Sequence, residues 1–269
     1  MNEIFIFIMY FMIYSFCGWV LESTYKSVLE RKIINSGFLA GPFCPIYGYG
    51  ALIMYFALRD VTNNIIVLFL FGTIALSVFE YIVGLFLEIV FQTKYWDYSN
   101  KKFNIHGRVC LLNSLYWGIL GIIFMKLIHP SVEKFVTLIP DTVLMIIVII
   151  GLIYLVFDTI NTTVRVIKIN IRLKDWEQLT EDIKNRIEAI NAKNSIRFEN
   201  INRLRRVQKY KILRKIAEIK QSDDLLGKLK MRQNDVHAKL EKRMKRLHKA
   251  FPNMSSERLT KFWNNYKKS

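Results

Sequence analysis

Long apolar stretches alternate with short polar connections over the first 166 residues of the chain. They cover residues 4–25, 44–58, 65–91, 109–128 and 142–166. A helix needs about 20 residues to cross about 30 Å of hydrocarbon, and each stretch approaches or exceeds this length. The shortest, 44–58, includes Pro45, which neighbouring helices in a membrane bundle accommodate. The pattern predicts an all-α polytopic membrane protein with about five transmembrane helices.

Basic residues concentrate in alternate connections of this predicted bundle. Two connections are rich in Lys and Arg: Lys26, Arg31 and Lys32 in the first, and Lys94, Lys101, Lys102 and Arg108 in the third. The second and fourth carry one basic loop residue each, Arg59 and Lys134. Because short basic loops stay in the cytoplasm, we expect a multi-pass protein of the cell membrane with its N-terminus outside. Trp19 and Glu22 stand where a leader would be cleaved, so we expect the first stretch to remain in the mature protein.

The remaining residues, 167–269, form a basic and less apolar region. Residues 1–166 carry 11 basic and 10 acidic side chains, whereas 167–269 carry 28 and 12, so the net charge of +17 resides almost wholly in the tail. This shift predicts two domains, a membrane bundle at 1–166 and a cytosolic helical domain at 167–269. Anionic lipid headgroups are the nearest partner for such charge beside a bilayer. We therefore expect contact with membrane lipids and no nucleic acid.

Apolar residues in the tail follow helical spacing in two runs. Ile183, Ile187 and Ile190 form one run, and Leu229, Val236, Leu240 and Leu247 form the other. Ser222–Gly227 supply helix-start and helix-breaking residues between them, so we place the turn of a helical hairpin or coiled coil there. Trp176 is interpreted as a membrane-interface anchor. The hairpin either docks a partner or second copy, or packs only on itself.

Ionisable residues within the apolar stretches are the candidate functional groups. Buried charges in a bilayer are costly and usually face a bundle interior or a water-filled cavity. Glu80 and Glu88 share one face of the third stretch because they lie eight residues apart. With Arg108 at the foot of the fourth stretch as a counter-charge and the polar Asn113 one turn from Trp117, the candidate cavity residues are Glu22, Glu80, Glu88, Arg108, Asn113 and Asp158. This set predicts a polar cavity open to the cytoplasm.

Such a cavity would hold a proton, a cation, a hard metal ion bound by carboxylates or a polar headgroup. The alternative is structural, with each acid hydrogen-bonded or paired to a neighbouring helix. The three cysteines and four histidines show no spacing typical of a transition-metal site. We therefore name no metal-ligand residues, and we expect no transition-metal site and no cofactor.

Two cytoplasmic connections are rich in glycine, proline and aromatic residues, which impose a defined path on the backbone. The first supplies Gly41, Pro42, Pro45 and Tyr47, and the third supplies Trp96, Asp97, Tyr98, Asn104 and Gly107. We expect these loops to fold back against the helix ends and to contribute to a site.

Four short sequence motifs in these regions occur together in a known family. They are YSFCGWVLE at 14–22, GFL at 37–39 with GPFCPIYG at 41–48, WDYS at 96–99, and Asn104 with GRVCL at 107–111. The chain resembles, over residues 5–165, the bacterial family described as putative ABC-transporter type IV permeases. The resemblance implies a multi-span permease component and does not reach the basic tail.

The resulting functional prediction is a membrane transport component that acts with a partner. The chain contains no Gly-rich phosphate loop of the Walker type, so ATP-driven transport requires a separate ATPase subunit. Five helices are few for a pore, so we also expect a homo- or hetero-oligomer. The alternative is a membrane-embedded enzyme acting on a lipid headgroup, which would use Glu80, Glu88, Asp158 and Arg108 as acid, base and anion-binding groups. It lacks a diagnostic catalytic spacing, so an enzyme is the less favoured class.

Overall fold

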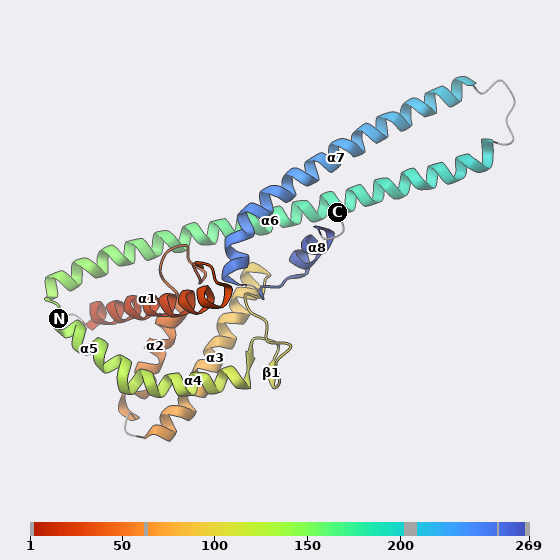
Figure 1. Ribbon diagram of the computed structural model, residues 1–269. Helices are drawn as coiled ribbons and strands as arrows, with labels where there is room; N and C mark the ends of the chain where they lie inside the picture. The colour runs from red at the N-terminus through yellow and green to blue at the C-terminus, as the bar shows by residue number, and fades with distance from the viewer. Residues whose placement is uncertain (1–2, 62–63, 202–208, 252, 267–269) are drawn as a thin grey trace. The chain divides into compact units, whose positions relative to one another are not determined.

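The computed structural model describes residues 3–61, 64–201, 209–251 and 253–266. The protein is mostly helical (Figure 1). Two compact units are present: residues 1–167 with 245–256, and residues 168–244 with 257–269. The short segment 245–256 thus belongs with the apolar unit although it lies far along the chain, a return that the sequence pattern does not indicate.

The first unit contains the apolar helices. They are α1 (Glu3–Glu30), α2 (Pro45–Leu58) with the short η1 (Arg59–Val61), α3 (Ile65–Phe91), α4 (Leu111–Ile123), the π-helical turn η2 (Phe124–Ile128), α5 (His129–Thr137) and the first part of α6 (Asp141–Ile201). A small antiparallel hairpin, β1 (Asn104–Ile105) and β2 (Val109–Cys110), precedes α4. Asn64 caps α3 by accepting hydrogen bonds from the backbone N–H groups of Ile66 and Val67.

Four stretches of helix are long and apolar enough to cross a membrane: Glu3–Glu30, Ile65–Phe91, Leu111–Thr137 and Asp141–Ile190. The all-α membrane prediction is therefore confirmed in its main feature. Helix α2 has 14 residues, which gives about 21 Å at about 1.5 Å per residue. It falls short of the hydrocarbon thickness, so these four do not include the second predicted span.

One apolar core joins α1 to α6 in this unit. Its fully buried side chains are Met9, Tyr10 and Tyr14 of α1, Met54 and Leu58 of α2, Leu68 and Leu76 of α3, Phe124 and Met125 of η2, Val136 of α5, and Leu144 and Val148 of α6, and α4 adds the partly buried Trp117 and Ile122. The opposite faces remain apolar although exposed, as at Phe86, Ile150 and Phe157. Exposed apolar surface of this extent is typical of helices surrounded by lipid.

Glycines bring α1 and α2 unusually close together. A Cβ atom at Gly18 would collide with the Tyr47 ring, and one at Gly48 would collide with Ser15 and Phe11. Small residues on facing helices permit this approach in membrane bundles. The packing holds the start of α2, and hence Tyr47, against α1.

The second unit consists of the later part of α6, most of α7 (Lys209–Ala250) and α8 (Glu257–Tyr266). Helix α7 runs without interruption through Ser222–Gly227, so the predicted turn there is wrong. A helix interior tolerates one glycine at a cost of about 1 kcal/mol, and the other residues of this 42-residue helix outweigh it. Helix α6 ends at Ile201 and α7 begins at Lys209, and residues 202–208 lie outside the described part of the chain.

Trp176 lies in the core of this second unit. It is 3% exposed, with its ring 5.0 Å from Phe262 and 6.3 Å from His237. The prediction of a membrane-interface anchor is wrong, because the aromatic side chains of α7 and α8 cover the indole. Glu177 pairs with Lys261 of α8 at 2.8 Å, and Thr180 accepts a hydrogen bond from Gln233 of α7 at 2.8 Å.

Because of this aromatic cluster, we expect the second unit to lose thermal stability at acidic pH. His237 stacks on Phe262 with ring centroids 4.2 Å apart, and burial lowers the pKa of His237 below its usual value, against the opposing effect of Glu241. A lowered pKa means that the folded unit favours the neutral imidazole. The stability that neutral His237 contributes is therefore fully present above about pH 6.5, and it is lost as the pH falls through the pKa of the folded state. Thermal melts of the full-length protein between pH 7.5 and 5 should show a decrease that is smaller in His237→Gln. An equal decrease in both proteins would contradict this role.

Candidate functional site

Glu80 is the most deeply buried acid of the first unit. It lies in α3 and is 5% exposed. One carboxylate oxygen accepts a hydrogen bond from the indole N–H of Trp117 in α4 at 2.9 Å, and the other accepts one from the Tyr98 hydroxyl at 3.3 Å. Tyr98 also has a side-chain hydrogen bond with Asn113 of α4. The structure therefore brings together two of the predicted cavity residues, Glu80 and Asn113, through Tyr98.

Tyr98 lies in the loop between α3 and α4 and acts as a neutral donor. Burial, followed by the nearby Glu80 carboxylate, raises the pKa of Tyr98 well above its usual value. The phenol therefore keeps its proton at neutral pH and donates a hydrogen bond to Glu80. Glu80 consequently has two donors, both uncharged.

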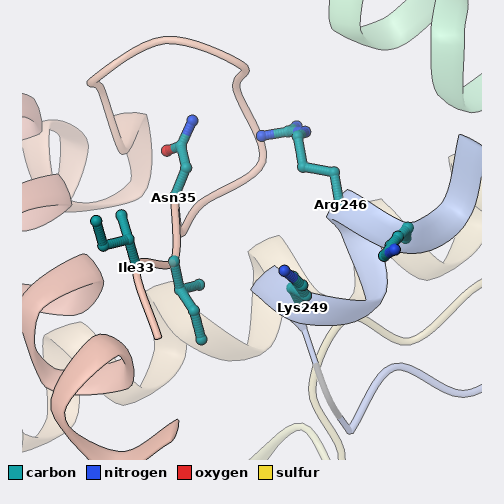
Figure 2. A pocket seen from close by; sticks show the side chains of 6 residues that line it. Ile33, Asn35, Arg246 and Lys249 are labelled. Atoms are coloured by element: carbon teal, nitrogen blue, oxygen red, sulfur yellow. The ribbon is translucent and has the colours of Figure 1, made fainter. Parts of the chain in front are cut away.

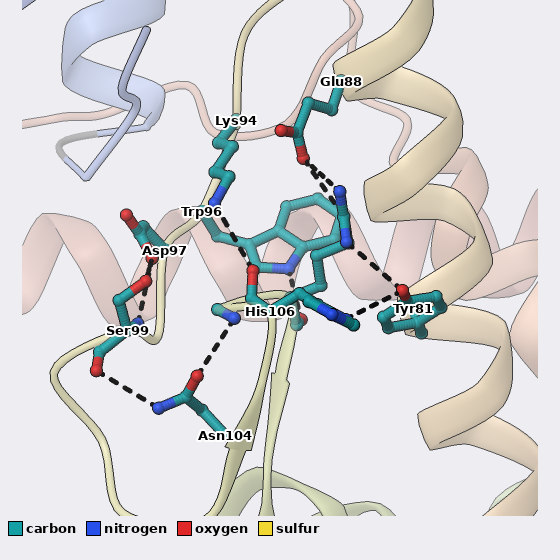
Figure 3. Close-up of polar contacts among 10 residues, drawn as sticks. Tyr81, Glu88, Lys94, Trp96, Asp97, Ser99, Asn104 and His106 are labelled. Carbon is teal, nitrogen blue, oxygen red and sulfur yellow. Dashed lines mark hydrogen bonds and ion pairs between the residues drawn. The ribbon is translucent and has the colours of Figure 1, made fainter.

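Glu88 and Arg108 form a separate ion pair at the end of α3 (Figure 3). The Nε and Nη2 atoms of Arg108 lie 3.1 and 2.8 Å from the same carboxylate oxygen of Glu88. The Nη1 atom donates to the Tyr81 hydroxyl at 3.3 Å, and the guanidinium lies 5.2 Å from the centre of the Tyr81 ring. Arg108 is thus held by a carboxylate, a hydroxyl and an aromatic face.

The motif residues of the 92–110 loop mainly build the loop itself (Figure 3). Trp96 donates its indole N–H to the Arg108 carbonyl at 2.9 Å, and Asp97 accepts the backbone N–H of Ser99 at 2.9 Å. Asn104 accepts the N–H of Gly107 at 3.1 Å, and Gly107 has a φ of 70°, which favours glycine. Although burial opposes it, hydrogen bonding from Ser99 holds the pKa of Asp97 below its usual value. These contacts fix the position of Tyr98 beside Glu80.

Glu22 sits near the end of α1 beside the 31–44 loop. Its carboxylate pairs with Lys26 at 2.6 Å and accepts a hydrogen bond from the Cys44 thiol at 3.4 Å. Lys26 also donates to the Ser36 hydroxyl at 2.9 Å and to the Ala250 carbonyl at 2.5 Å. The pair therefore ties α1 to the loop and to the returning segment 245–256.

Asp158 of α6 binds the backbone of the same loop. Its two oxygens accept the N–H groups of Gly41 at 2.8 Å and Ala40 at 3.3 Å, and Thr162 donates to it at 3.4 Å. Pro42 follows immediately in this loop, and Pro45 occupies the first turn of α2. Asp158 thus holds the backbone of the 31–44 loop, which leads into α2, and Tyr47 lies in the first turn of that helix.

Gly41 has no room for a side chain. A Cβ atom there would collide with the Tyr154 hydroxyl and lie 3.0 Å from the Asp158 carboxylate. We expect Gly41→Ala to lower the apparent melting temperature of the purified protein, at a cost of about 1–3 kcal/mol from overpacking. The matched control is Gly227→Ala in α7, where a Cβ meets nothing within 4 Å and helix propensity should improve. Similar melting temperatures for the two variants would contradict the tight contact.

A family model described as putative ABC-transporter type IV matches residues 9–163, more than half of the chain. The chain belongs to this family. No curated protein and no solved structure matches it. The match in the ABC-transporter type IV family includes all six predicted cavity residues and the two motif-rich loops, but it ends before the tail.

Within the family region, the predicted cavity residues occupy several local groups. Glu80 and Asn113 share Tyr98, Glu88 pairs with Arg108, Glu22 pairs with Lys26, and Asp158 holds the 31–44 loop. Tyr47 lies close to two of them: its ring is 6.5 Å from Trp117, and both Glu22 and Glu80 act on it electrostatically. In the described part of the chain, no three His, Cys, Asp or Glu side chains gather as a metal site.

Sequence reasoning missed one buried polar group. His129 is 5% exposed, and its Nδ1 atom lies 2.7 Å from the Tyr14 hydroxyl. The rings of Tyr55 and Tyr10 lie 4.5 and 5.3 Å from it, directly after the π-helical turn η2. Such turns often accompany functional sites, but no spacing in the sequence indicates one.

Proposed function

We propose that this protein is the permease component of an ATP-driven transport system and that Glu80 is its central polar group. Membership of the ABC-transporter type IV family and the four apolar helices support a membrane transport component. ATP hydrolysis would come from a separate subunit, because the sequence contains no phosphate-binding loop. Glu80 would take up a proton, a cation or a polar group of the substrate from the cytoplasmic side.

The observation that carries the proposal is the charge balance of Glu80. Two of the other candidate acids pair with a cation, Glu22 with Lys26 and Glu88 with Arg108. A third, Asp158, accepts hydrogen bonds from two backbone N–H groups. Among the described residues, only the neutral side chains Trp117 and Tyr98 donate to Glu80. An acid in an apolar bundle without a cationic partner is stable when it carries a proton or binds a cation, and this makes it suited to exchange.

We further propose a five-pass arrangement in which α2 and η1 together make the short second pass. The N-terminus would lie outside, and the 31–44 loop, the 92–110 loop and the second unit would be cytoplasmic. Single cysteines in a background without Cys17, Cys44 and Cys110 test this arrangement. A membrane-impermeant maleimide should label Asp60→Cys and Lys134→Cys in intact cells and Lys101→Cys only after permeabilisation. The reverse pattern would exclude the arrangement.

Purification of the full-length chain in a gentle detergent tests the function. Mass spectrometry of the sample should find an ATPase in a fixed ratio to this chain, and the native mass should show the copy number of both. An absent ATPase would contradict the permease proposal. Chemical conversion of a copurifying lipid by the purified chain would favour a membrane enzyme acting on a lipid headgroup.

A further inference from the structure

A basic pocket lies in the first unit, between the 31–44 loop and the last turns of α7. Its volume is about 350 Å³, and its lining residues are Ile33, Ile34, Asn35, Lys245, Arg246 and Lys249 (Figure 2). Three of the six side chains are cationic and come from a single turn of helix. Pockets of this size accommodate small ligands.

Hydrogen bonds hold the walls of this pocket. Arg246 donates to the backbone carbonyls of Leu39 at 2.7 Å and Phe38 at 2.8 Å. On the opposite wall, the Asn35 side chain accepts the indole N–H of Trp19 and donates to the Ala40 carbonyl, both at 2.7 Å. The pocket is therefore built before a ligand arrives, and Arg246 is part of its structure.

The second feature of this pocket is the pair of exposed lysines on α7. Lys245 and Lys249 lie four residues apart, so they share one face of α7. Neither pairs with an acid of the described chain, whereas Lys26, Lys228, Lys239 and Lys261 all do. Asp158 acts electrostatically on Arg246 more strongly than Arg165 does and with the opposite sign, so the positive charge that the described residues leave unbalanced lies on the two lysines. An anion would relieve the repulsion between Lys245 and Lys249.

An exposed apolar side chain, Ile33, lines the cationic pocket, and further exposed apolar residues precede it in the sequence. Ile33 is 97% exposed, and Val28 and Leu29 near the end of α1 are 71% and 64% exposed. Cationic groups beside exposed aliphatic side chains match an amphiphile with an anionic head and an acyl chain. A soluble phosphate compound would use the lysines but gain nothing from Ile33.

We propose that this pocket binds the phosphate of an anionic phospholipid, with Lys245 and Lys249 on the phosphate and Ile33 against the acyl chain. The lipid would fasten the returning segment 245–256 to the 31–44 loop. The site is independent of the ATPase partner. Its test therefore distinguishes failure of the lipid site from failure of the transport proposal.

Binding of short-chain phosphatidylglycerol to the full-length protein in detergent tests the proposal, with short-chain phosphatidylcholine and inorganic phosphate as comparisons. We expect saturable thermal stabilisation by phosphatidylglycerol alone. The double variant K245Q/K249Q should bind on the order of tenfold or more weakly, because each lysine contributes separately. Both side chains are exposed, so folding should be unaffected. Ile33→Gln should weaken binding of the lipid without creating phosphate binding.

The matched control is K228Q/K239Q, which removes the same charge from exposed positions of the second unit. It should bind phosphatidylglycerol as the unaltered protein does. Equal weakening in the two double variants would show a general charge effect and overturn the site. Stabilisation by inorganic phosphate that is lost in K245Q/K249Q would replace the lipid with a soluble ligand, and absence of any stabilisation would overturn the pocket altogether.

Discussion

Cells whose only copy of this protein carries Glu80→Gln should show the same defect as cells from which the protein has been deleted, although the variant reaches the membrane in normal amount. Glutamine has nearly the same shape and keeps one oxygen for Trp117 or Tyr98, but it can neither ionise nor bind a cation through charge. One unsatisfied donor costs about 1–3 kcal/mol, so part of the fold's stability is lost as well. Growth of the complemented strain and immunoblots of its membranes measure the two effects.

Two control variants separate the charge of Glu80 from its hydrogen bonds. Trp117→Phe removes the 2.9 Å hydrogen bond and leaves the acid, so it should lower thermal stability but retain activity. Asp60→Asn neutralises an exposed acid of the same unit, 85% accessible, and should change neither. Normal growth with Glu80→Gln would contradict a role for this carboxylate in transport.

Arg108→Ala should reduce the stability of the purified protein more than any substitution of a surface charge. Its side chain is 13% exposed, and its loss would leave Glu88 and Tyr81 without their shared partner. Removing one member of a largely desolvated pair costs about 2–5 kcal/mol. The apparent melting temperature in detergent measures the change, and Glu88→Ala in the Arg108→Ala background should cost little more because the pair is already broken.

Lys228→Ala provides the matched comparison for Arg108→Ala. Lys228 pairs with Asp224 at 2.7 Å, but both side chains are about two thirds exposed, and such pairs contribute about 0–1 kcal/mol. Equal shifts for Lys228→Ala and Arg108→Ala would show that the Arg108 group does not stabilise the loop.

The length and composition of the apolar stretches account for what could be predicted of the fold. The apolar stretches at 65–91 and 142–166 coincide with or lie within helices of the structure because length and composition alone decide membrane helices. The turn assigned to Ser222–Gly227 failed because Asp and Gly have only weak local preferences, which a long helix overrides. The prediction that Trp176 is a membrane-interface anchor failed because only the tertiary fold brings Phe262 to its ring.

The burial of two candidate acids was predictable, but their contacts were not. Glu80 and Asp158 lie inside apolar stretches of the sequence, and both are buried. The sequence could not show that Asp158 binds the backbone of Gly41, 117 residues away, or that Arg246 returns to Leu39, 207 residues away. Contacts over such separations depend on how the helices pack, and no local pattern in the sequence encodes them.

The ATP-hydrolysis rate of particles purified through a tag on this chain tests the central claim most directly. The account predicts that the particles contain a separate ATPase and hydrolyse ATP, and that Glu80→Gln particles keep the ATPase but lose the stimulation of hydrolysis by the transported compound. Intact particles of the full-length chain that neither contain an ATPase nor hydrolyse ATP would contradict the claim.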